Sequence, residues 1–504
     1  MNNGQLPQPP AVAGQPVSSF PKQAIVVIHG IGEQIPMDTI RGFVRAAWET
    51  ATDLTANGLP NPAEVWSKPD VRTGSLELRR ITTRQSIPTD TFARGVRSDF
   101  YELYWADLSA GSTLRQVEDW IAGLLLRNPL TRVPADVFLA WIVLWLLALT
   151  VIALAVVTAL PDKVSLGPFN LWDCPLLNWL HSFQKWQLAL ATVVLGTVTH
   201  KFVFPYAGRV VRYTRAKPDN IAARKNIRER GLELLSELHK GYDRIIIVGH
   251  SLGSILAYDL ISYFWANRPE SHTVVEGTPE FDALRELERA IAGLGGSTSP
   301  SPAAMAAYQD AQAEFARLLR LRPKPTGDTP DTRWLITDLV TLGSPLSHAE
   351  FLMAKSKKDL EERQQDREYP RSPPLREELD PINKTKAEQA GFPLDPRKPQ
   401  LLAFPFGAHQ QWQLHHASPF AATRWTNIYD PARLVLFGDL ISGPVAPVFG
   451  RAIDDVDLQE LRGQSWRFTH TRYWTLPKNI GATVPVHIAE LRKALDLGGQ
   501  RRRL

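Results

Sequence analysis

The chain has 504 residues, of which 44% are hydrophobic and 22% are charged, a composition typical of a folded protein. Its 57 Lys and Arg residues against 52 Asp and Glu residues leave a net charge of +5, too small an excess to indicate a nucleic-acid partner. The single cysteine, Cys174, excludes an intrachain disulfide and a cysteine-based metal cage.

Residues 1–23 are polar and rich in Pro, Gly and Gln. A secretion signal needs a basic start followed by an apolar stretch, and this segment contains neither. We predict a disordered leader that ends where the first apolar run begins, at Ala24.

Two apolar runs in the middle of the chain predict a transmembrane hairpin over residues 136–205, with spans at about 137–160 and 186–205. The first run has no charge over 24 residues, and as a helix it would be roughly 36 Å long, enough to cross a bilayer core. The alternative for this run is a buried helix of a globular domain. The second run carries His200 and Lys201 near its end.

Basic residues flank the two predicted spans on their outer sides, at Arg127 and Arg132 before the first and from Lys201 onward after the second. Such an excess marks the cytoplasmic side of a membrane. We therefore expect a multi-pass membrane protein whose two long arms, including the catalytic part, lie in the cytoplasm.

Short apolar runs alternate with amphipathic stretches in both arms, at residues 24–135 and 206–504. This alternation indicates a mainly parallel sheet covered by helices on both faces, so we expect the two arms to form one α/β unit. The expected strands are Ala24–Ile28, Ser75–Thr82, Asp99–Trp105, Arg244–Val248, Trp334–Leu346 and Thr423–Asp430. The expected helices include Met37–Leu54, a segment ending at Gly241, and Leu252–Trp265.

Two insertions interrupt the second arm, at about 269–331 and 355–399. The first has the pattern of two helices, and the second is strongly charged and contains several prolines. Both are interpreted either as solvated surface or as a cap or lid over a site.

The sequence GHSLG, from Gly249 to Gly253, matches the pattern G-x-S-x-G between an expected strand and an expected helix. A serine in this position stands on a sharp turn, where the glycines let neighbouring backbone approach closely. We predict that Ser251 is a nucleophile and that the Leu252 amide contributes to an oxyanion hole. The alternative is a glycine-rich turn with a capping serine.

A second glycine-rich loop, HGIG from His29 to Gly32, follows the first expected strand. Its glycines allow close backbone approach, and the Ile31 amide is the candidate for the second oxyanion donor. Gly-rich loops in this position also bind nucleotides, but no G-x-G-x-x-G motif or P-loop lysine follows here. His29 and His250 fit loop-shaping or packing roles.

The HGIG loop and the GHSLG turn together resemble the α/β-hydrolase superfamily, in particular its lipase- and esterase-like serine hydrolases. The resemblance implies the α/β-hydrolase fold, here with the transmembrane hairpin inserted, and a triad in the chain order serine, acid, histidine. His470 lies in the region where such enzymes keep the base, whereas the later His487 lies in an expected terminal helix. For the acid, Asp439 resembles the short acid loop of lipases, and Asp430 is the alternative.

These residues predict a membrane-anchored serine hydrolase that cleaves an ester-type substrate, with lipid esters among the candidates, through a Ser–His–Asp triad and an acyl-enzyme. Such chemistry needs no metal or organic cofactor, and the histidines lack metal-ligand spacing. The alternative function is an inactive, hydrolase-shaped membrane scaffold that binds a partner. The expected partners are therefore a small ester or lipid-like substrate and the membrane, with the oligomeric state left open.

Overall fold

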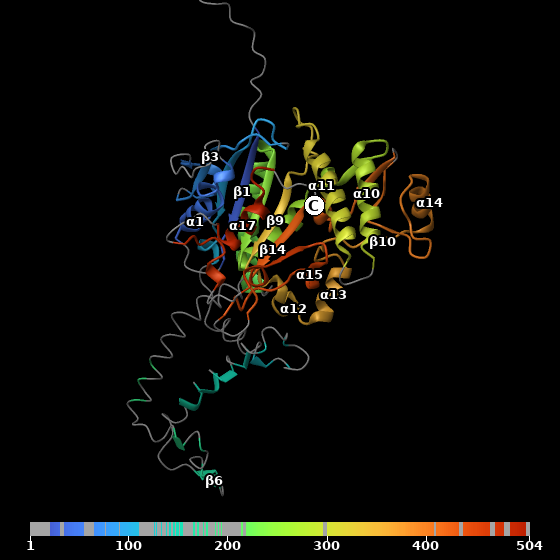
Figure 1. Cartoon of the computed structure of the whole chain (residues 1–504). Coiled ribbons are helices and arrows are strands. Elements are labelled where there is room, and N and C mark those ends of the chain that lie inside the picture. The colour runs from blue at the N-terminus through green and yellow to red at the C-terminus, as the bar shows by residue number, and fades with distance from the viewer. Residues whose placement is uncertain are drawn as a thin grey trace, which may run out of the picture.

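The computed structural model contains a mainly parallel α/β sheet with helices packed on it (Figure 1). It describes residues 21–30, 35–54, 65–109 apart from 76 and 90, 218–295, 300–407, 410–432, 437–463, 469–477 and 484–499, together with isolated residues between 125 and 214. The statements below concern these described residues.

The main sheet has eight strands in the order β15-β14-β9-β7-β1-β4-β3-β2. The six strands from β15 to β4 are parallel, whereas β3 pairs antiparallel with both β4 and β2. The strands are β1 (Lys22–Ile28), β2 (Val65–Pro69), β3 (Arg79–Gln85), β4 (Arg97–Leu103), β7 (Arg244–His250), β9 (Ile336–Leu342), β14 (Arg424–Tyr429) and β15 (Asp454–Asp457).

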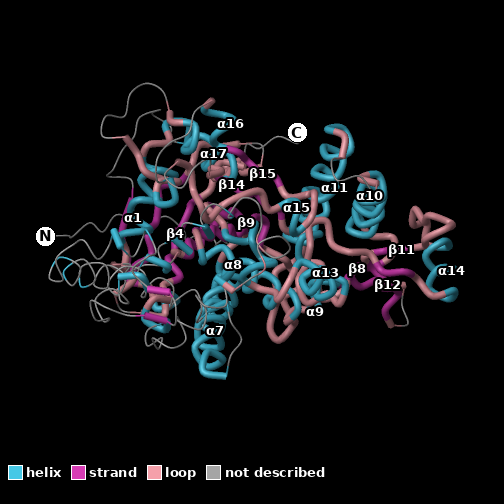
Figure 2. The backbone as a smooth tube through the Cα atoms, turned by 90° about the horizontal axis from the view of Figure 1, so that it is seen from below, coloured by secondary structure: helices cyan, strands magenta, loops and turns pink. Residues whose placement is uncertain are grey.

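Helices cover both faces of this sheet, as seen from below in Figure 2. In β1 the side chains of Val26 and Ile28 pack in one apolar core with α7 and α8, whereas Ile25 and Val27 pack in a second core with α1 and α17. This follows from the two-residue period of a strand, which sends successive side chains to opposite faces. The four helices are α1 (Asp38–Val44), α7 (Pro218–Gly241), α8 (Leu252–Ala266) and α17 (Val486–Leu495).

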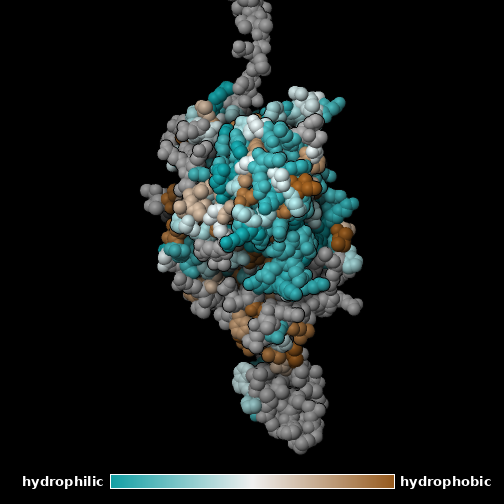
Figure 3. Space-filling model, turned by 90° about the vertical axis from the view of Figure 1, so that its right-hand side faces the viewer, coloured by the Kyte–Doolittle hydropathy of each residue, from teal (hydrophilic) through white to brown (hydrophobic). Residues whose placement is uncertain are grey.

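The two insertions fold into further helices beside this unit, where α10 and α11 lie side by side (Figure 1). The face that carries α10, α13 and α14 is mainly hydrophilic (Figure 3). The remaining helices are α9 (Pro269–His272), α10 (Pro279–Gly293), α11 (Pro302–Leu321), α12 (Ala349–Leu352), α13 (Lys357–Gln365), α14 (Pro381–Gln389), α15 (Ala446–Phe449) and α16 (Leu458–Arg462). Short strands form three small sheets, from β5 (Ser165–Leu166), β6 (Phe169–Asn170), β8 (Thr273–Val275), β10 (Glu377–Glu378), β11 (Gln400–Leu401), β12 (Ala403–Phe406) and β13 (Gln411–Leu414).

The predicted transmembrane hairpin over 136–205 is wrong. In the part of the chain that the structure describes, no helix is both long enough and apolar enough to cross a bilayer. The prediction used the length of an apolar run as its criterion, but a span also needs a continuous helix of about 20 residues. Most of residues 137–160 and 186–205 lie outside the described residues. The predictions of a membrane anchor and of a cytoplasmic placement depended on this hairpin, so they are not supported either.

The carboxyl ends of the parallel strands place several loops at one edge of the sheet. Ile28 of β1 pairs with Gly249 of β7, and Leu342 of β9 pairs with both His250 of β7 and Ile428 of β14. The chain segments that follow these strands therefore begin next to one another. Open α/β sheets bind their ligands at this edge.

Candidate active site

Ser251 stands on a sharp turn between β7 and α8. Its backbone angles, φ 53° and ψ −130°, lie in a region that non-glycine residues rarely adopt. The turn is fixed because the Ser251 N–H donates to the Leu342 carbonyl of β9 at 2.9 Å. A strained serine between a strand and a helix is the geometry of a nucleophile turn.

The predicted close approach of backbone around this turn is present. A side chain on Gly253 would place its Cβ 2.4 Å from the Ile28 carbonyl oxygen, and one on Gly30 would lie 2.6 Å from the Ser251 Cβ. Gly249 ends the part of β7 that pairs with β1. Glycine is therefore required where the loop after β1 meets the turn after β7.

His470 lies in a short 3-10 helix, Thr469–Thr471, and contacts two of the predicted residues. Its Nε2 is 2.9 Å from the Ser251 Oγ, and its Nδ1 is 2.9 Å from the Asp439 Oδ2. In a neutral imidazole whose Nδ1–H donates to the carboxylate, Nε2 is free to accept the serine hydroxyl proton. The structure thus brings three residues, from positions 251, 439 and 470, into one hydrogen-bonded chain.

Asp439 is held by donors other than His470. Its side chain is fully buried, the Ile441 N–H donates to Oδ1 at 2.9 Å, and the Tyr473 hydroxyl donates to Oδ2 at 2.8 Å. Burial acts to raise the pKa of Asp439, but the hydrogen bond and charge of His470, with the other donors, lower it below its ordinary value. The carboxylate is therefore kept ionised opposite the imidazole.

The alternative acid, Asp430, is paired elsewhere. Its buried carboxylate lies 2.6 Å from Arg462, and its backbone carbonyl accepts the Asp439 N–H at 2.8 Å. Asp430 therefore supports the loop that carries Asp439, and the contact with His470 is made by Asp439 alone of the two.

The structure describes one of the two candidate oxyanion donors. Leu252 is the first residue of α8, where backbone N–H groups have no partner inside the helix and the helix dipole favours an anion. Ile31 and Gly32 lie outside the described residues. The Leu252 amide is therefore available beside Ser251, and the second donor stays a prediction.

The loop after β1 is anchored on both sides of the segment 31–34. The His29 ring stacks on Trp105 at 5.5 Å between ring centroids, and its Nε2 accepts the Trp105 N–H at 3.2 Å. At the other side, the Glu102 carboxylate accepts the Met37 N–H at 2.9 Å. Burial raises the pKa of Glu102 to about 7. Both anchors come from the end of β4 and the residues directly after it.

Two residues near Ser251, Asp439 and His470 make contacts that the motif alone did not predict. The His250 Nε2–H donates to the His470 carbonyl at 2.7 Å, and burial, followed by the charge of His470, lowers the pKa of His250 to about 3. His250 is therefore a neutral donor that fixes the His470 backbone. Tyr473, whose hydroxyl binds Asp439, was missed because its only sequence signal is its position three residues after His470.

His487, the other histidine considered as the base, lies apart from these contacts in α17, where its Nε2 bonds to the Thr475 carbonyl at 2.9 Å. No group of three metal-ligating side chains occurs within the described ranges.

Comparisons with models of protein families, with curated proteins and with solved structures found no match.

Proposed function

We propose that this protein is a serine hydrolase of the α/β-hydrolase type that cleaves an ester-type substrate through an acyl-enzyme. The observation that carries the proposal is the placement of His470, which is 2.9 Å from both the Ser251 Oγ and the Asp439 carboxylate. A base within hydrogen-bond reach of a nucleophile, oriented by a buried acid, is the arrangement that activates a serine hydroxyl.

The reaction follows from these contacts. As the Ser251 Oγ attacks the substrate carbonyl carbon, its proton passes to the His470 Nε2, and the Asp439 carboxylate stabilises the imidazolium that forms. The Leu252 amide, with Ile31 as the second proposed donor, binds the oxyanion. His470 then gives the proton to the leaving alcohol. A water molecule, deprotonated by His470, then attacks the acyl carbon; the bond to the Ser251 Oγ breaks, the carboxylic acid leaves, and His470 returns the proton to the Ser251 Oγ.

The alternative of an inactive scaffold assumed that the acid or the base is misplaced. The contacts of His470 with both partners weigh against that assumption. The strained backbone of Ser251 also favours the catalytic interpretation over the scaffold, because a purely structural turn at this position has no need of a non-glycine residue with positive φ.

The test is the rate of hydrolysis of p-nitrophenyl acetate and p-nitrophenyl butyrate by the full chain. We expect a burst of p-nitrophenol equal to the protein concentration, followed by slower turnover, because p-nitrophenol leaves in a fast acylation step and the acyl-enzyme then accumulates before the slower deacylation. The Ser251→Ala variant should show neither phase. Ser262→Ala, which removes a hydroxyl from the same helix, is the matched control and should behave as the wild type. Equal rates in wild type and Ser251→Ala would refute the proposal.

A further inference from the structure

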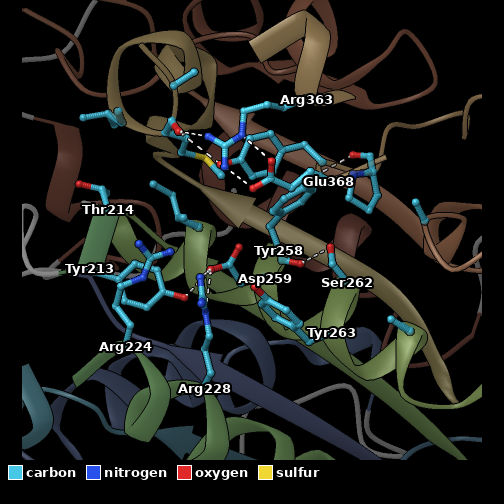
Figure 4. A pocket seen from close by; sticks show the side chains of 18 of the residues that line it. Tyr213, Thr214, Arg224, Arg228, Tyr258, Asp259, Ser262, Tyr263, Arg363 and Glu368 are labelled. Carbon is cyan, nitrogen blue, oxygen red and sulfur yellow. Dashed lines mark hydrogen bonds and ion pairs between the residues drawn. The ribbon is translucent and has the colours of Figure 1, made fainter. Parts of the chain in front are cut away.

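A cavity of about 1000 Å³ lies along the side of α8. One wall is formed by α7 and α8 and the other by the segment 352–370, which includes α13, with His416 and Ala417 nearby (Figure 4). Neither Ser251, His470 nor Asp439 lines it. The cavity is large enough for an organic ligand and is separate from the candidate active site.

The lining of this cavity is both basic and apolar. Six Lys and Arg residues line it against four Asp and Glu residues. Between the charges lie aromatic and aliphatic side chains, among them Tyr258, Ile255 and Leu232. A ligand that matches this lining has an anionic group and an apolar part.

Most of the cations are already neutralised by carboxylates. Asp259 accepts hydrogen bonds from Arg228 at 2.6 Å and from the Tyr213 hydroxyl at 2.8 Å (Figure 4). On the opposite wall, the Arg363 Nε donates to Glu368 at 2.6 Å. These pairs hold the two walls in place and leave little net charge of their own.

Arg224 differs from these arginines. Its guanidinium lies 5.9 Å from the centre of the Tyr213 ring and, among the described residues, no carboxylate pairs with it (Figure 4). Its Nε is buried and has no hydrogen-bond partner within the described part of the chain. A guanidinium that lines a cavity and has no carboxylate partner favours an anion in that cavity. Lys355, on the opposite wall, likewise has no ion pair among the described residues.

We propose that this cavity binds an amphipathic phosphate monoester, whose phosphate contacts Arg224 and Lys355 and whose apolar chain lies against the face of α8. A phosphate carries up to two negative charges and three terminal oxygens, so it can accept hydrogen bonds from more than one cation. A carboxylate, with one charge, can neutralise only one of them. The assignment does not depend on the hydrolase proposal, because no triad residue takes part.

The test is isothermal titration calorimetry of the full chain with octyl phosphate. We expect Arg224→Met to weaken octyl phosphate binding by at least about tenfold, because a charge-assisted hydrogen bond is lost. Lys355→Met changes an exposed residue, so it should fold normally and weaken binding several-fold. Arg289→Met, on the exposed face of α10, is the matched control and should bind as the wild type. Ser251→Ala should also bind normally.

Three further ligands test which parts of octyl phosphate the cavity recognises. Inorganic phosphate should bind more weakly than octyl phosphate because it lacks the chain, and octanoate should bind more weakly because it lacks the second charge. Octyltrimethylammonium should not bind. The proposal is overturned if folded wild-type protein does not bind octyl phosphate, if octanoate or the cation binds as tightly, or if Arg224→Met and Lys355→Met both bind octyl phosphate unchanged. Loss of binding in Ser251→Ala would instead place the ligand in the active site.

Discussion

Helix α8 borders two sites of different character. At its first residue, the polar groups of Ser251, His470 and Asp439 are hydrogen-bonded to one another. Along its side, the cavity leaves the buried Nε of Arg224 without a partner among the described residues. The three side chains of the first arrangement have their hydrogen-bond partners without a ligand, as expected for a preorganised reaction centre. The second lacks an acceptor, as expected for a site completed by the molecule that it binds.

The largest expected effect that separates the two sites is that of Ser251→Ala. Removal of the nucleophile should lower kcat/KM for p-nitrophenyl esters by on the order of 10⁵-fold, because the triad acts as a unit. Octyl phosphate binding in the cavity should stay unchanged. Steady-state kinetics and calorimetry on the same preparation check both. A parallel loss of ester hydrolysis and octyl phosphate binding would mean that the two sites are one.

The second effect distinguishes the two aspartates that follow β14. Asp439→Asn should lower kcat by about 10⁴-fold, because the amide no longer holds His470 in the productive tautomer. Asp430→Asn should leave kcat within a few-fold of the wild type, but it removes the charge opposite Arg462 and should lower the free energy of unfolding by about 3–5 kcal/mol. Kinetics and urea denaturation measure the two quantities. The reverse pattern would make Asp430 the acid.

Tyr473→Phe should have a smaller effect on the same carboxylate. The variant removes one donor to Asp439, so the pKa of Asp439 should rise and kcat should fall by about tenfold, equivalent to a hydrogen bond of about 1.4 kcal/mol. The fall in kcat should be larger below pH 5 than at pH 8, because protonation of Asp439 then begins at a higher pH. An unchanged pH–rate profile would assign Tyr473 to packing alone.

The last effect concerns stability and not activity, at a histidine away from the candidate active site. Burial lowers the pKa of His239 to about 3, whereas in the unfolded chain a histidine titrates near 6.5. Between these values the unfolded state binds a proton that the folded state does not, so the free energy of unfolding falls as the pH falls from about 6.5 to about 3.

We therefore expect His239→Gln to reduce the slope of unfolding free energy against pH by about 1.4 kcal/mol per pH unit in this window. Urea denaturation between pH 4 and pH 7 measures the slope. If wild type and His239→Gln have the same slope, the histidine is protonated in the folded protein, in conflict with its buried position.

Much of the sheet could be predicted from the sequence, because its central strands are apolar runs that end at glycines. β1 and β7 lie where Ala24–Ile28 and Arg244–Val248 were expected, extended by two residues each. The outer strand β3 begins at Arg79 and not at Ser75, since its alternation is weak and only pairing with its neighbours fixes its ends. The hairpin prediction failed because apolar length does not distinguish a span from other apolar segments.

The candidate site was predictable only where a motif marks it. GHSLG located Ser251, and the expected chain order then suggested positions for the acid and the base. This order did not decide whether Asp430 or Asp439 is the acid, because both follow the same strand. Only their contacts distinguish them: Asp430 pairs with Arg462, and Asp439 pairs with His470. The cavity along α8 had no sequence signal, because its walls come from α7, α8 and a segment about 100 residues later.

The most direct test of the account is mass spectrometry of the full chain after reaction with a fluorophosphonate, which modifies activated serines covalently. We expect one adduct per chain, located on the peptide that contains Ser251 and absent from Ser251→Ala. A folded protein that forms no adduct, or forms the same adduct in Ser251→Ala, would contradict the assignment of Ser251 as an activated nucleophile.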